Sequence, residues 1–575
     1  MARAFPRVAC FALLLVGCLV TAAVISWLRV NSSDKETQQS PKGPLAQAEN
    51  RLHNGGAEPT GPEATFHLTE QQQRGKQFYS TGVSVTGGTT AVLGDSISEI
   101  PASALKCVNC HLQDGRGKPE GGILPSNICW DELTKPYGSR IAPGRNRPPY
   151  DALLLKRAIT MGLDSSGRSL DHAMPRYRMT NSDLADLVSY LMVLGRELDP
   201  GLSAHRVRIG VILPPSQRFP EMNQAMRAAL AAFVSEFNRA GGVYHREIDL
   251  RFTESPARRE DRSEAAIEFV KREQVFALAT SFIAGAEADI ARRLDEEGVP
   301  LIGAQTLYPQ MDFPLNRHVF YLTSGLQAQC RALIRFARDR RLNNRQSAVL
   351  LFSQDKEHSD EGNANAGLAV VANSIKTSCS ELGWKLQQLP APPKGIDQRL
   401  VETRSSVIFS LLTGEQNVRF LKSAAANDWY PTCFLLGDLA GRELFEAPAG
   451  FDRRLFLSFG SLPSQLPFGI RAHSKLADEF KLPTTQLAAQ FETLAAMTTL
   501  VQALQQAGTR LSRDRLIEQL ETFHEYRTGF APPITFGPNR RLGANGSYVV
   551  TLDLTNKKLV SVSDWVEAPV PSHAD

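Results

Sequence analysis

The sequence lacks a strong excess of either charge and lacks the best-known catalytic motifs. Its 64 Lys and Arg residues exceed its 60 Asp and Glu residues by only 4, which argues against a nucleic-acid-binding or polybasic membrane-surface protein. Eight cysteines in 575 residues are too few for a disulfide scaffold. The chain contains no phosphate-binding P-loop, no G-x-S-x-G elbow and no H-E-x-x-H zinc motif. We therefore expect no intrinsic catalysis.

The N-terminus contains the one long apolar run in the chain. Val8 to Leu28 is a 21-residue segment without a charge, preceded by two arginines. This length crosses the hydrocarbon core of a bilayer, and the arginines keep the N-terminus cytoplasmic. Residues 1–30 are therefore expected to be a membrane signal anchor, with a signal peptide cleaved after Ala23 or a lipoprotein processed before Cys18 as alternatives. Each alternative places the bulk of the protein in the periplasm, behind a polar, flexible linker at residues 31–65.

The strongest motif in the chain is Cys107-Val108-Asn109-Cys110-His111, the C-x-x-C-H pattern of c-type haem attachment. The chemistry explains the spacing. Two thiols separated by two residues can each add to a vinyl group at one edge of a porphyrin, and the adjacent imidazole can reach the iron. A redox dithiol or half of a zinc site also uses C-x-x-C, but the sequence contains no second C-x-x-C. The motif predicts one covalently bound haem c.

The sequence around this motif resembles a class I cytochrome c. A helix over residues 68–79 with Thr69 as its N-cap, a helix over 153–161, a Met-Pro loop and a helix capped by Asn181 or Ser182 surround the motif. "RGKQFY", "CVNCH", "DGRG" and "MPRYRMTNSDLADLVSYL" carry the resemblance, which implies an all-α cytochrome c domain over residues 66–200.

The cytochrome resemblance also implies the iron ligands. His111 and Met174 are the expected axial pair, and a thioether ligand favours reduced iron. Met179 and His172 are the rival ligands in the same segment. Two features depart from the family: residues 80–106 form a longer link than usual, and Leu112 occupies a position where these cytochromes often have glycine.

From Val207 the pattern changes to alternating strands and helices. Expected strands include 207–213, 247–252, 275–280, 300–302, 347–352, 407–411 and 432–436, and expected helices include 223–238, 262–271, 283–296, 366–382 and 417–427. This order predicts parallel, doubly wound sheets that bind ligands at the carboxyl ends of their strands.

This larger region, residues 205–575, resembles a type I periplasmic binding protein of the branched-chain amino-acid kind. "VRIGVILPP", "EEGVPLIGAQT" and "PPITFGPNRRLGANGSYVVTLDL" carry the resemblance. It implies two α/β lobes, joined by three crossovers, that close on a small molecule by hinge motion. In lobe one the implied ligand-binding residues are Thr280, Ser281, Ala304, Gln305 and Thr306, which would hold a carboxylate, and in lobe two Asp438, which would meet an ammonium group.

Taken together, these patterns predict a multidomain, membrane-tethered periplasmic cytochrome that transfers electrons and carries a small-molecule-binding module, for example for an amino-acid-like ligand. The expected partners are a redox protein and the ligand, with no nucleic acid. One alternative is the solute-binding receptor of an ABC importer, working with an ABC permease, in which the cytochrome is accessory. Another is the electron-acceptor subunit of a periplasmic dehydrogenase. The acidic run from Asp355 to Glu361 lacks the spacing of a calcium loop and is expected to be a solvated loop.

Overall fold

The computed structural model describes residues 68–569, apart from 95, 97, 118, 120, 136–138, 142–144, 312, 343–346, 354–361 and 392–397. The predicted signal anchor, the linker and the acidic run at 355–361 lie outside the described residues. Among the helices that are described, none combines the length and the apolar character that a membrane crossing needs.

The region around the C-x-x-C-H motif has a helical framework. Its helices are α3 (Glu70–Thr81), α4 (Cys107–His111), α5 (Trp130–Leu133), α6 (Ala152–Met161) and α7 (Asn181–Leu191). Thr69 caps α3 as predicted, in a capping box with Gln72. The N-cap of α7 was predicted at Asn181 or Ser182, but it is Thr180. The Thr180 hydroxyl accepts a hydrogen bond from the backbone N–H of Asp183.

Short strands make this region mixed α and β, so the expectation of an all-α domain was wrong. β1 (Thr90–Val92) pairs antiparallel with both β2 (Ile100–Pro101) and β5 (Arg176–Arg178). β3 (Ser139–Ile141) and β4 (Arg145–Arg147) form a separate antiparallel pair. The long link at residues 80–106 supplies β1 and β2, and this is where the sequence departs from the cytochrome pattern.

Helices α3 and α7 pack closely because a glycine lies between them. A Cβ at Gly75 would lie 2.1 Å from the backbone oxygen of Asp186 and 2.8 Å from Cβ of Tyr190. Phe78 and Tyr79 follow on the same face of α3 and are almost fully buried, and the Tyr79 ring meets Tyr190 edge-on at 5.5 Å. This contact forms the centre of the domain's own hydrophobic core.

The first lobe of the larger region is a three-layer α/β/α unit. Its five-stranded sheet has the order β10-β9-β8-β6-β7 and is parallel throughout. Lobe one consists of β6 (Arg206–Leu213), α8 (Pro220–Arg239), β7 (Glu247–Glu254), α9 (Arg262–Glu273), β8 (Ala277–Ala279), α10 (Glu287–Glu296), β9 (Leu301–Ile302), β10 (Val319–Phe320), α16 (Pro467–Phe480), α17 (Leu487–Ala507) and α18 (Arg513–Leu520).

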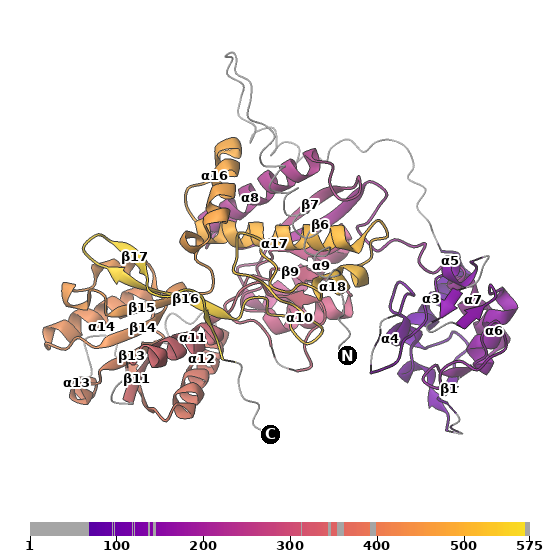
Figure 1. The fold of residues 1–575 in the computed structure, drawn as a ribbon, viewed down its shortest axis with the longest axis horizontal. Helices are drawn as coiled ribbons and strands as arrows, with labels where there is room; N and C mark the ends of the chain where they lie inside the picture. The colour runs from indigo at the N-terminus through magenta and orange to yellow at the C-terminus, as the bar shows by residue number, and fades with distance from the viewer. Residues whose placement is uncertain are drawn as a thin grey trace, which may run out of the picture. The chain divides into compact units, whose positions relative to one another are not determined.

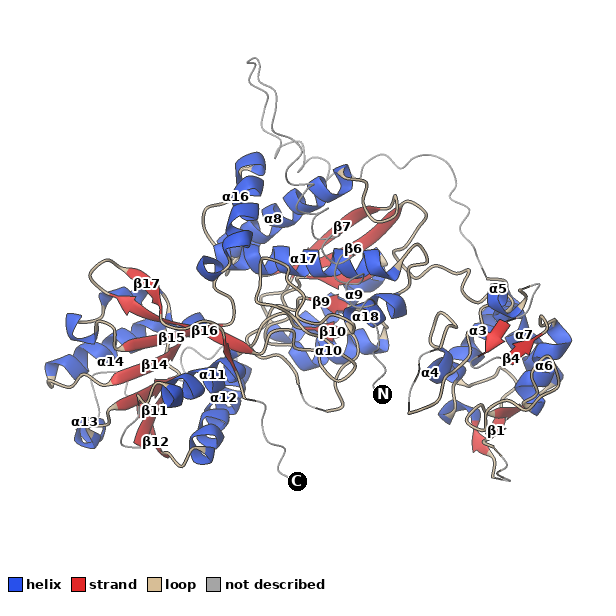
Figure 2. Ribbon diagram, viewed as in Figure 1, coloured by secondary structure: helices blue, strands red, loops and turns tan. Residues whose placement is uncertain are grey.

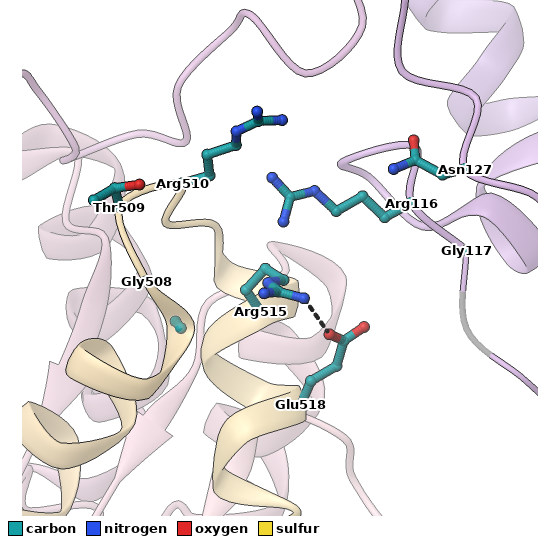
Figure 3. A pocket seen from close by; sticks show the side chains of 9 residues that line it. Arg116, Gly117, Asn127, Gly508, Thr509, Arg510, Arg515 and Glu518 are labelled. Carbon is teal, nitrogen blue, oxygen red and sulfur yellow. Dashed lines mark ion pairs between the residues drawn. The ribbon is translucent and has the colours of Figure 1, made fainter. Parts of the chain in front are cut away.

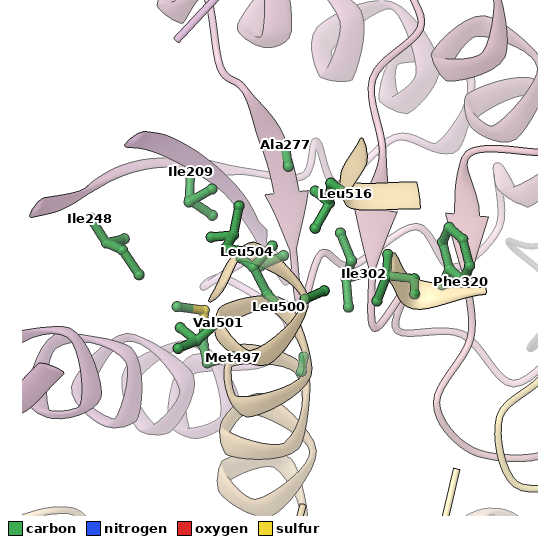
Figure 4. Packing of buried hydrophobic residues seen from close by; sticks show 14 of the residues in the cluster. Ile209, Ile248, Ala277, Ile302, Phe320, Met497, Leu500, Val501, Leu504 and Leu516 are labelled. Atoms are coloured by element: carbon green, nitrogen blue, oxygen red, sulfur yellow. The ribbon is translucent and has the colours of Figure 1, made fainter. Parts of the chain in front are cut away.

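Alternating side chains along each strand of lobe one serve two separate cores. Ile209, Ala277 and Ile302 face α17 and α18, where Met497, Leu500, Val501 and Leu504 cover the sheet (Figure 4). Leu278 and Leu301 point to the opposite face, against α9 and α10. A strand buried on both faces has a continuous apolar sequence, which is what residues 209–213 show.

The second lobe repeats this architecture around a larger sheet. The strand order is β12-β11-β13-β14-β15-β16-β17, parallel from β12 to β15 and antiparallel from β15 onward, with β18 paired to β16. Lobe two consists of α11 (Leu326–Asp339), β11 (Ser347–Ser353), α12 (Gly362–Glu381), β12 (Lys385–Ala391), α13 (Gln398–Thr403), β13 (Val407–Ser410), α14 (Gly414–Ala426), β14 (Thr432–Leu436), α15 (Gly437–Ala440), β15 (Leu455–Phe459), β16 (Gly546–Asp553), β17 (Lys558–Ser561) and β18 (Val566–Glu567).

The chain passes between the two lobes three times within the described residues, as the family resemblance implied. It leaves lobe one after β10, returns after β15 and crosses again between α18 and β16. In Figure 1 the late segments α17 and α18 are drawn in yellow-orange among the magenta elements of lobe one, and in Figure 2 helices flank the strands of both sheets. The predicted two-lobed α/β fold is therefore confirmed.

Candidate functional site

The C-x-x-C-H motif folds into a single short helix, α4, whose last residue is held by a backbone carbonyl. The His111 ring is only 7% exposed, and its Nδ1 lies 2.9 Å from the carbonyl oxygen of Ser126. Because a carbonyl oxygen only accepts, Nδ1 carries the proton and Nε2 keeps its lone pair. Burial lowers the pKa of His111, which favours this neutral form. His111 is thus prepared to bind a metal ion through Nε2.

The two thiols of the motif have different surroundings. Cys110 is exposed, whereas Cys107 is half-buried, and its Sγ lies 3.8 Å from the hydroxyl of Tyr177. Burial raises the pKa of the Cys107 thiol to about 11, so it is protonated at neutral pH. Within the described residues, no group of three or more His, Cys, Asp or Glu side chains forms a metal site, which leaves no zinc-site partners there for this C-x-x-C. Two thiols and an imidazole on one helical turn are the donors that covalent haem attachment requires.

The backbone around these donors is fixed at Leu112 and at the methionine loop. Leu112 has a φ of 61° in the left-handed region, and its carbonyl oxygen accepts from the Tyr79 hydroxyl at 2.5 Å. In the loop, the Arg176 guanidinium donates to the carbonyl oxygens of Leu170, Asp171 and Met174. This clamp gives the Met174 segment a defined backbone path.

The rival ligands are placed differently from Met174. Met179 packs against the hydrophobic core of the domain, and His172 is exposed, with its carbonyl oxygen accepting from the Gly94 N–H at 3.0 Å. Met174 is half-buried and does not belong to that core. Of the two methionines, Met174 is the one that lies outside this core.

In lobe one, Thr280 adopts a strained backbone at the carboxyl end of β8. Its φ is 43°, a value that β-branched residues rarely adopt, and its side chain is fully buried. Its Oγ1 accepts from Nε2 of Gln305 at 3.2 Å and lies 3.3 Å from Oγ1 of Thr493 on α17. Backbone strain of this kind is concentrated at functional sites, so Thr280 marks a candidate ligand position.

The other residues predicted in lobe one already have partners. The Ser281 hydroxyl accepts from the Ile212 N–H at 3.1 Å and donates to the Ala279 carbonyl oxygen at 3.1 Å. Thr306 donates to a Glu287 carboxylate oxygen at 2.6 Å, and Ala304 lies half-buried at the edge of a lobe-one core. These hydroxyls stabilise the loops that follow the strands. The structure brings the two loops together, since the Gln305 N–H donates to the Ser281 carbonyl oxygen at 2.8 Å.

Gln305 is the exception among these residues. Its side chain is 8% exposed, and its Oε1 has no hydrogen-bond partner although it is buried. A buried oxygen without a partner costs free energy unless a donor reaches it. The Gln305 amide lies beside Thr280 and therefore next to α17.

In lobe two, Asp438 follows β14 and begins α15. Its Oδ2 accepts from Nε2 of Gln329 at 2.9 Å, and the amide oxygen of Gln329 accepts from the Ser458 hydroxyl at 3.4 Å. The Asp438 side chain is reached by solvent, yet protein atoms surround it closely enough that desolvation raises the pKa of its carboxyl group. Asp438 thus lies where a carboxylate gains from a cationic partner.

Glu492 on α17 is not among the site residues predicted from the sequence. Burial is the main cause that raises its pKa, to about 7, and the charge of Asp438 adds to it. Glu492 directly precedes Thr493, whose Oγ1 lies 3.3 Å from that of Thr280, so α17 carries a carboxyl group next to the candidate position in lobe one. A signal was present: Glu492 is the only charged residue in the sequence LAAQFETLAAMTTLVQALQQA of α17, and a lone charge in a largely buried helix is unusual.

A separate pocket of about 480 Å³ has a basic lining. Its lining residues are Arg116, Gly117, Asn127, Ala507, Gly508, Thr509, Arg510, Arg515 and Glu518. Figure 3 shows the side chains of Arg116 and Arg515 extending toward the same space, with Arg515 paired to Glu518 at 3.8 Å. No residue predicted from the sequence as a site residue lines this pocket.

Comparison with known proteins gives a consistent result for the larger region. The family model described as periplasmic binding protein matches residues 206–558. No curated protein sequence matches the chain. Three similar solved structures are a fatty acid ABC transporter substrate-binding protein from Thermomonospora curvata (14% identity, 64% of this chain and 95% of that chain covered, TM-score 0.49), a branched chain amino acid ABC transporter from Thermus thermophilus with bound valine (15%, 64% and 97%, 0.49) and a leucine binding protein from Thermotoga maritima (15%, 63% and 99%, 0.47).

Proposed function

Because this chain belongs to the periplasmic binding protein family, we propose that residues 206–558 are a periplasmic solute receptor whose two lobes close on a small molecule. The observation that carries the proposal is the position of Asp438 and Glu492. They come from different lobes, the charge of Asp438 adds to the raised pKa of Glu492, and Glu492 directly precedes Thr493, whose Oγ1 lies 3.3 Å from that of the strained Thr280. Functional groups supplied by both lobes suit a solute that holds the lobes together.

An ABC permease is the partner proposed for this receptor. In such a system the receptor delivers its solute to the permease, so capture needs reversible closure and no chemical step. The hydroxyl and carboxyl groups of the site suit this role, since their hydrogen bonds form and break without covalent change. The acceptance of solute by a permease remains a proposal that the family relationship supports.

The test of the receptor function is the detection of a captured solute and of lobe closure. The detergent-solubilised full chain is first purified under native conditions. It is then denatured, and the small molecules that it releases are identified by mass spectrometry. Each candidate is then added to the solute-free protein while the radius of gyration is measured by X-ray scattering. We expect a stoichiometric solute and a decrease in the radius of gyration. The absence of closure with every recovered or library solute would refute the receptor function.

We further propose that the domain around Cys107, Cys110 and His111 carries one covalent haem c. The supporting observation is the hydrogen bond from His111 Nδ1 to Ser126, which leaves Nε2 free on the same turn as both thiols. Each thiol S–H adds across one vinyl C=C bond, which forms a thioether and consumes no oxidant. Bound haem supplies one-electron transfer at its iron. His111 and Met174, the latter on the loop clamped by Arg176, would hold the iron.

A pyridine haemochrome spectrum of the denatured polypeptide tests this second proposal. Covalent haem survives acid–acetone extraction and gives an absorption band in alkaline pyridine. The double variant Cys107→Ala/Cys110→Ala is expected to lose this band. Cys129→Ala is the matched control, because Cys129 lies in the same domain but outside the motif. A wild-type protein without the band, produced in cells that mature c-type cytochromes, would refute haem attachment.

A further inference from the structure

The three connections between the lobes meet at Ser324. This residue lies in the first crossover, between β10 and α11, and its hydroxyl donates to the carbonyl oxygen of Gly546 at the start of β16, where the third crossover ends. Gly460 begins the second crossover after β15, and a Cβ placed there would lie only 2.8 Å from the Ser324 carbonyl oxygen. Ser324 is buried, so water competes little for these contacts. One residue thus lies against all three connections.

The first and third crossovers also pair with each other along their backbones. The Tyr321 N–H donates to the Arg541 carbonyl oxygen at 2.8 Å, and the Gly543 N–H donates to the Tyr321 carbonyl oxygen at 2.8 Å. The Ala544 N–H donates to the Leu322 carbonyl oxygen at 2.9 Å. Because each bond joins the two crossovers, these three N–H groups are protected from solvent exchange as long as the crossovers stay paired. Their exchange rates therefore report on the hinge.

Gln329, in the first turn of α11, links this hinge to the candidate site. Its Nε2 donates to the carbonyl oxygen of Ser324 at 3.2 Å and to Oδ2 of Asp438 at 2.9 Å. Its Oε1 accepts from the Ser458 hydroxyl on β15 at 3.4 Å. Both amide N–H groups are therefore in use, and turning the amide over would set its oxygen against a carbonyl and a carboxylate. Because Gln329 is only 1% exposed, a bond that it loses is not readily replaced by water.

From these contacts we propose that Gln329 is a positioning residue that ties the Asp438 carboxylate to the hinge between the lobes. The inference rests on the proposed receptor function and adds the route by which a solute at Asp438 acts on the crossovers. A solute that draws the carboxylate toward itself changes the hydrogen bond from Gln329, and the same amide holds Ser324. Since a hydrogen bond to a charged group is about twice as strong as a neutral one, the position of the amide depends most on the carboxylate.

A double-mutant cycle followed by hydrogen–deuterium exchange tests this coupling in the solute-free full chain. Asp438→Asn keeps the shape of the side chain and removes its charge, so the amide of Gln329 is held more weakly. Mass spectrometry of peptides that contain Tyr321, Gly543 and Ala544 should show exchange about three-fold or more faster than in the wild type. Gln329→Met, which has no amide, should speed this exchange by itself. In that background Asp438→Asn should add no further change.

Two control variants separate coupling from a general loss of charge or of stability. Glu415→Gln removes a negative charge from the exposed surface of α14 in lobe two. Asn238→Leu removes an amide of α8 in lobe one that bonds the backbone N–H and carbonyl oxygen of Ile248, both at 2.9 Å. Both controls should leave the exchange of the crossover peptides as in the wild type. Circular dichroism verifies that every variant retains the wild-type fold.

Ser324→Ala provides a second cycle in case Gln329→Met does not fold. It removes the hydroxyl that bonds Gly546 and leaves the buried amide in place. Because Gln329 holds the Ser324 carbonyl oxygen, the effects of Ser324→Ala and Asp438→Asn on the exchange of the third crossover should be less than additive. Fully additive effects would mean that the two residues act independently and would contradict the inference.

Three results of the first cycle would also overturn the inference. Asp438→Asn could leave the crossover exchange at the wild-type rate, it could speed the exchange equally with and without Gln329, or Asn238→Leu could speed it as much as Gln329→Met. Because exchange is measured without solute, each of these results leaves the receptor function standing. The receptor function is refuted separately, by X-ray scattering that shows no closure with any solute.

Discussion

At the scale of single residues, the raised pKa of Glu492 has a consequence for stability. An unperturbed glutamate titrates near 4.5, whereas burial and the charge of Asp438 bring the pKa of Glu492 to about 7 in the folded protein. The folded state therefore keeps a proton that the unfolded state has lost between these two values. Stability attributable to this group is present below pH 4.5 and is lost as the pH rises through 7.

Replacing Glu492 with glutamine removes this penalty. We expect Glu492→Gln to raise the unfolding temperature of the solute-free protein at pH 8 and to change it little at pH 5, because the carboxyl group is largely protonated at the lower pH. Thermal unfolding followed by circular dichroism at both pH values measures the effect, with Glu415→Gln as the exposed control. An equal shift at both pH values would contradict the assigned cause.

Individual residues also show what sequence can and cannot predict about a site. The departure at Leu112 was visible in the sequence, and the structure shows why glycine suits this position, since φ is 61°. The sequence predicted that hydroxyl-bearing residues follow the strands. Only the fold shows that the hydroxyls of Ser281 and Thr306 donate hydrogen bonds to other groups of the protein. Glu492 was missed because its one sequence signal, a lone charge in a buried helix, does not say that Asp438 of the other lobe influences its pKa.

At the scale of elements, the crossing of α3 and α7 depends on Gly75. Alanine has the higher helix propensity, by about 1 kcal/mol, so Gly75→Ala would stabilise an isolated helix. In this domain the added Cβ would lie 2.1 Å from the Asp186 carbonyl oxygen, and backbone cannot move aside without separating the helices. Overpacking costs about 1–3 kcal/mol or more, which outweighs the gain in propensity.

We therefore expect Gly75→Ala to destabilise the domain that contains α3 and α7. Limited proteolysis of the full chain, with fragments identified by mass spectrometry, should show faster cleavage within residues 68–200 than in the wild type. Gln71→Ala on the exposed face of α3 gains propensity without a clash and should be cleaved no faster than the wild type. If Gly75→Ala were as resistant as Gln71→Ala, the close approach of the helices would be wrong.

Whether an element was predictable depended on the strength of its periodicity. β14 was predicted with its observed bounds, and α3 was located from its capping residue, because apolar runs and caps are local signals. α10 begins at Glu287 instead of residue 283, since Gly285 adopts a φ of 84° that interrupts the helix. β1 and β2 were missed because they are only three and two residues long, and because β1, which pairs with β2, also pairs with the distant β5.

At the scale of the whole molecule, the two lobes are built from discontinuous segments. β16 belongs to the sheet of lobe two although it follows the last helices of lobe one. The family resemblance implied this arrangement, whereas strand and helix patterns alone gave only an alternating order. The three segments that cross between the lobes suit hinge motion, because a few residues in each segment can absorb the rotation.

The separate cores of the molecule predict that its two proposed activities are independent. The core of the C-x-x-C-H domain is formed by residues of that domain, from Phe78 to Leu194, whereas the lobes have cores of their own. A substitution that leaves one core intact has no direct route to unfold another.

Cys107→Ala/Cys110→Ala should therefore keep wild-type affinity for the solute, and Asp438→Asn/Glu492→Gln should keep the haemochrome band while losing the solute. Calorimetry and the pyridine spectrum, applied to both double variants, measure this. If loss of the thiols also abolished solute binding in a folded protein, the receptor would require its haem domain, and the view of two independent modules on one chain would have to be replaced by that of a single coupled site.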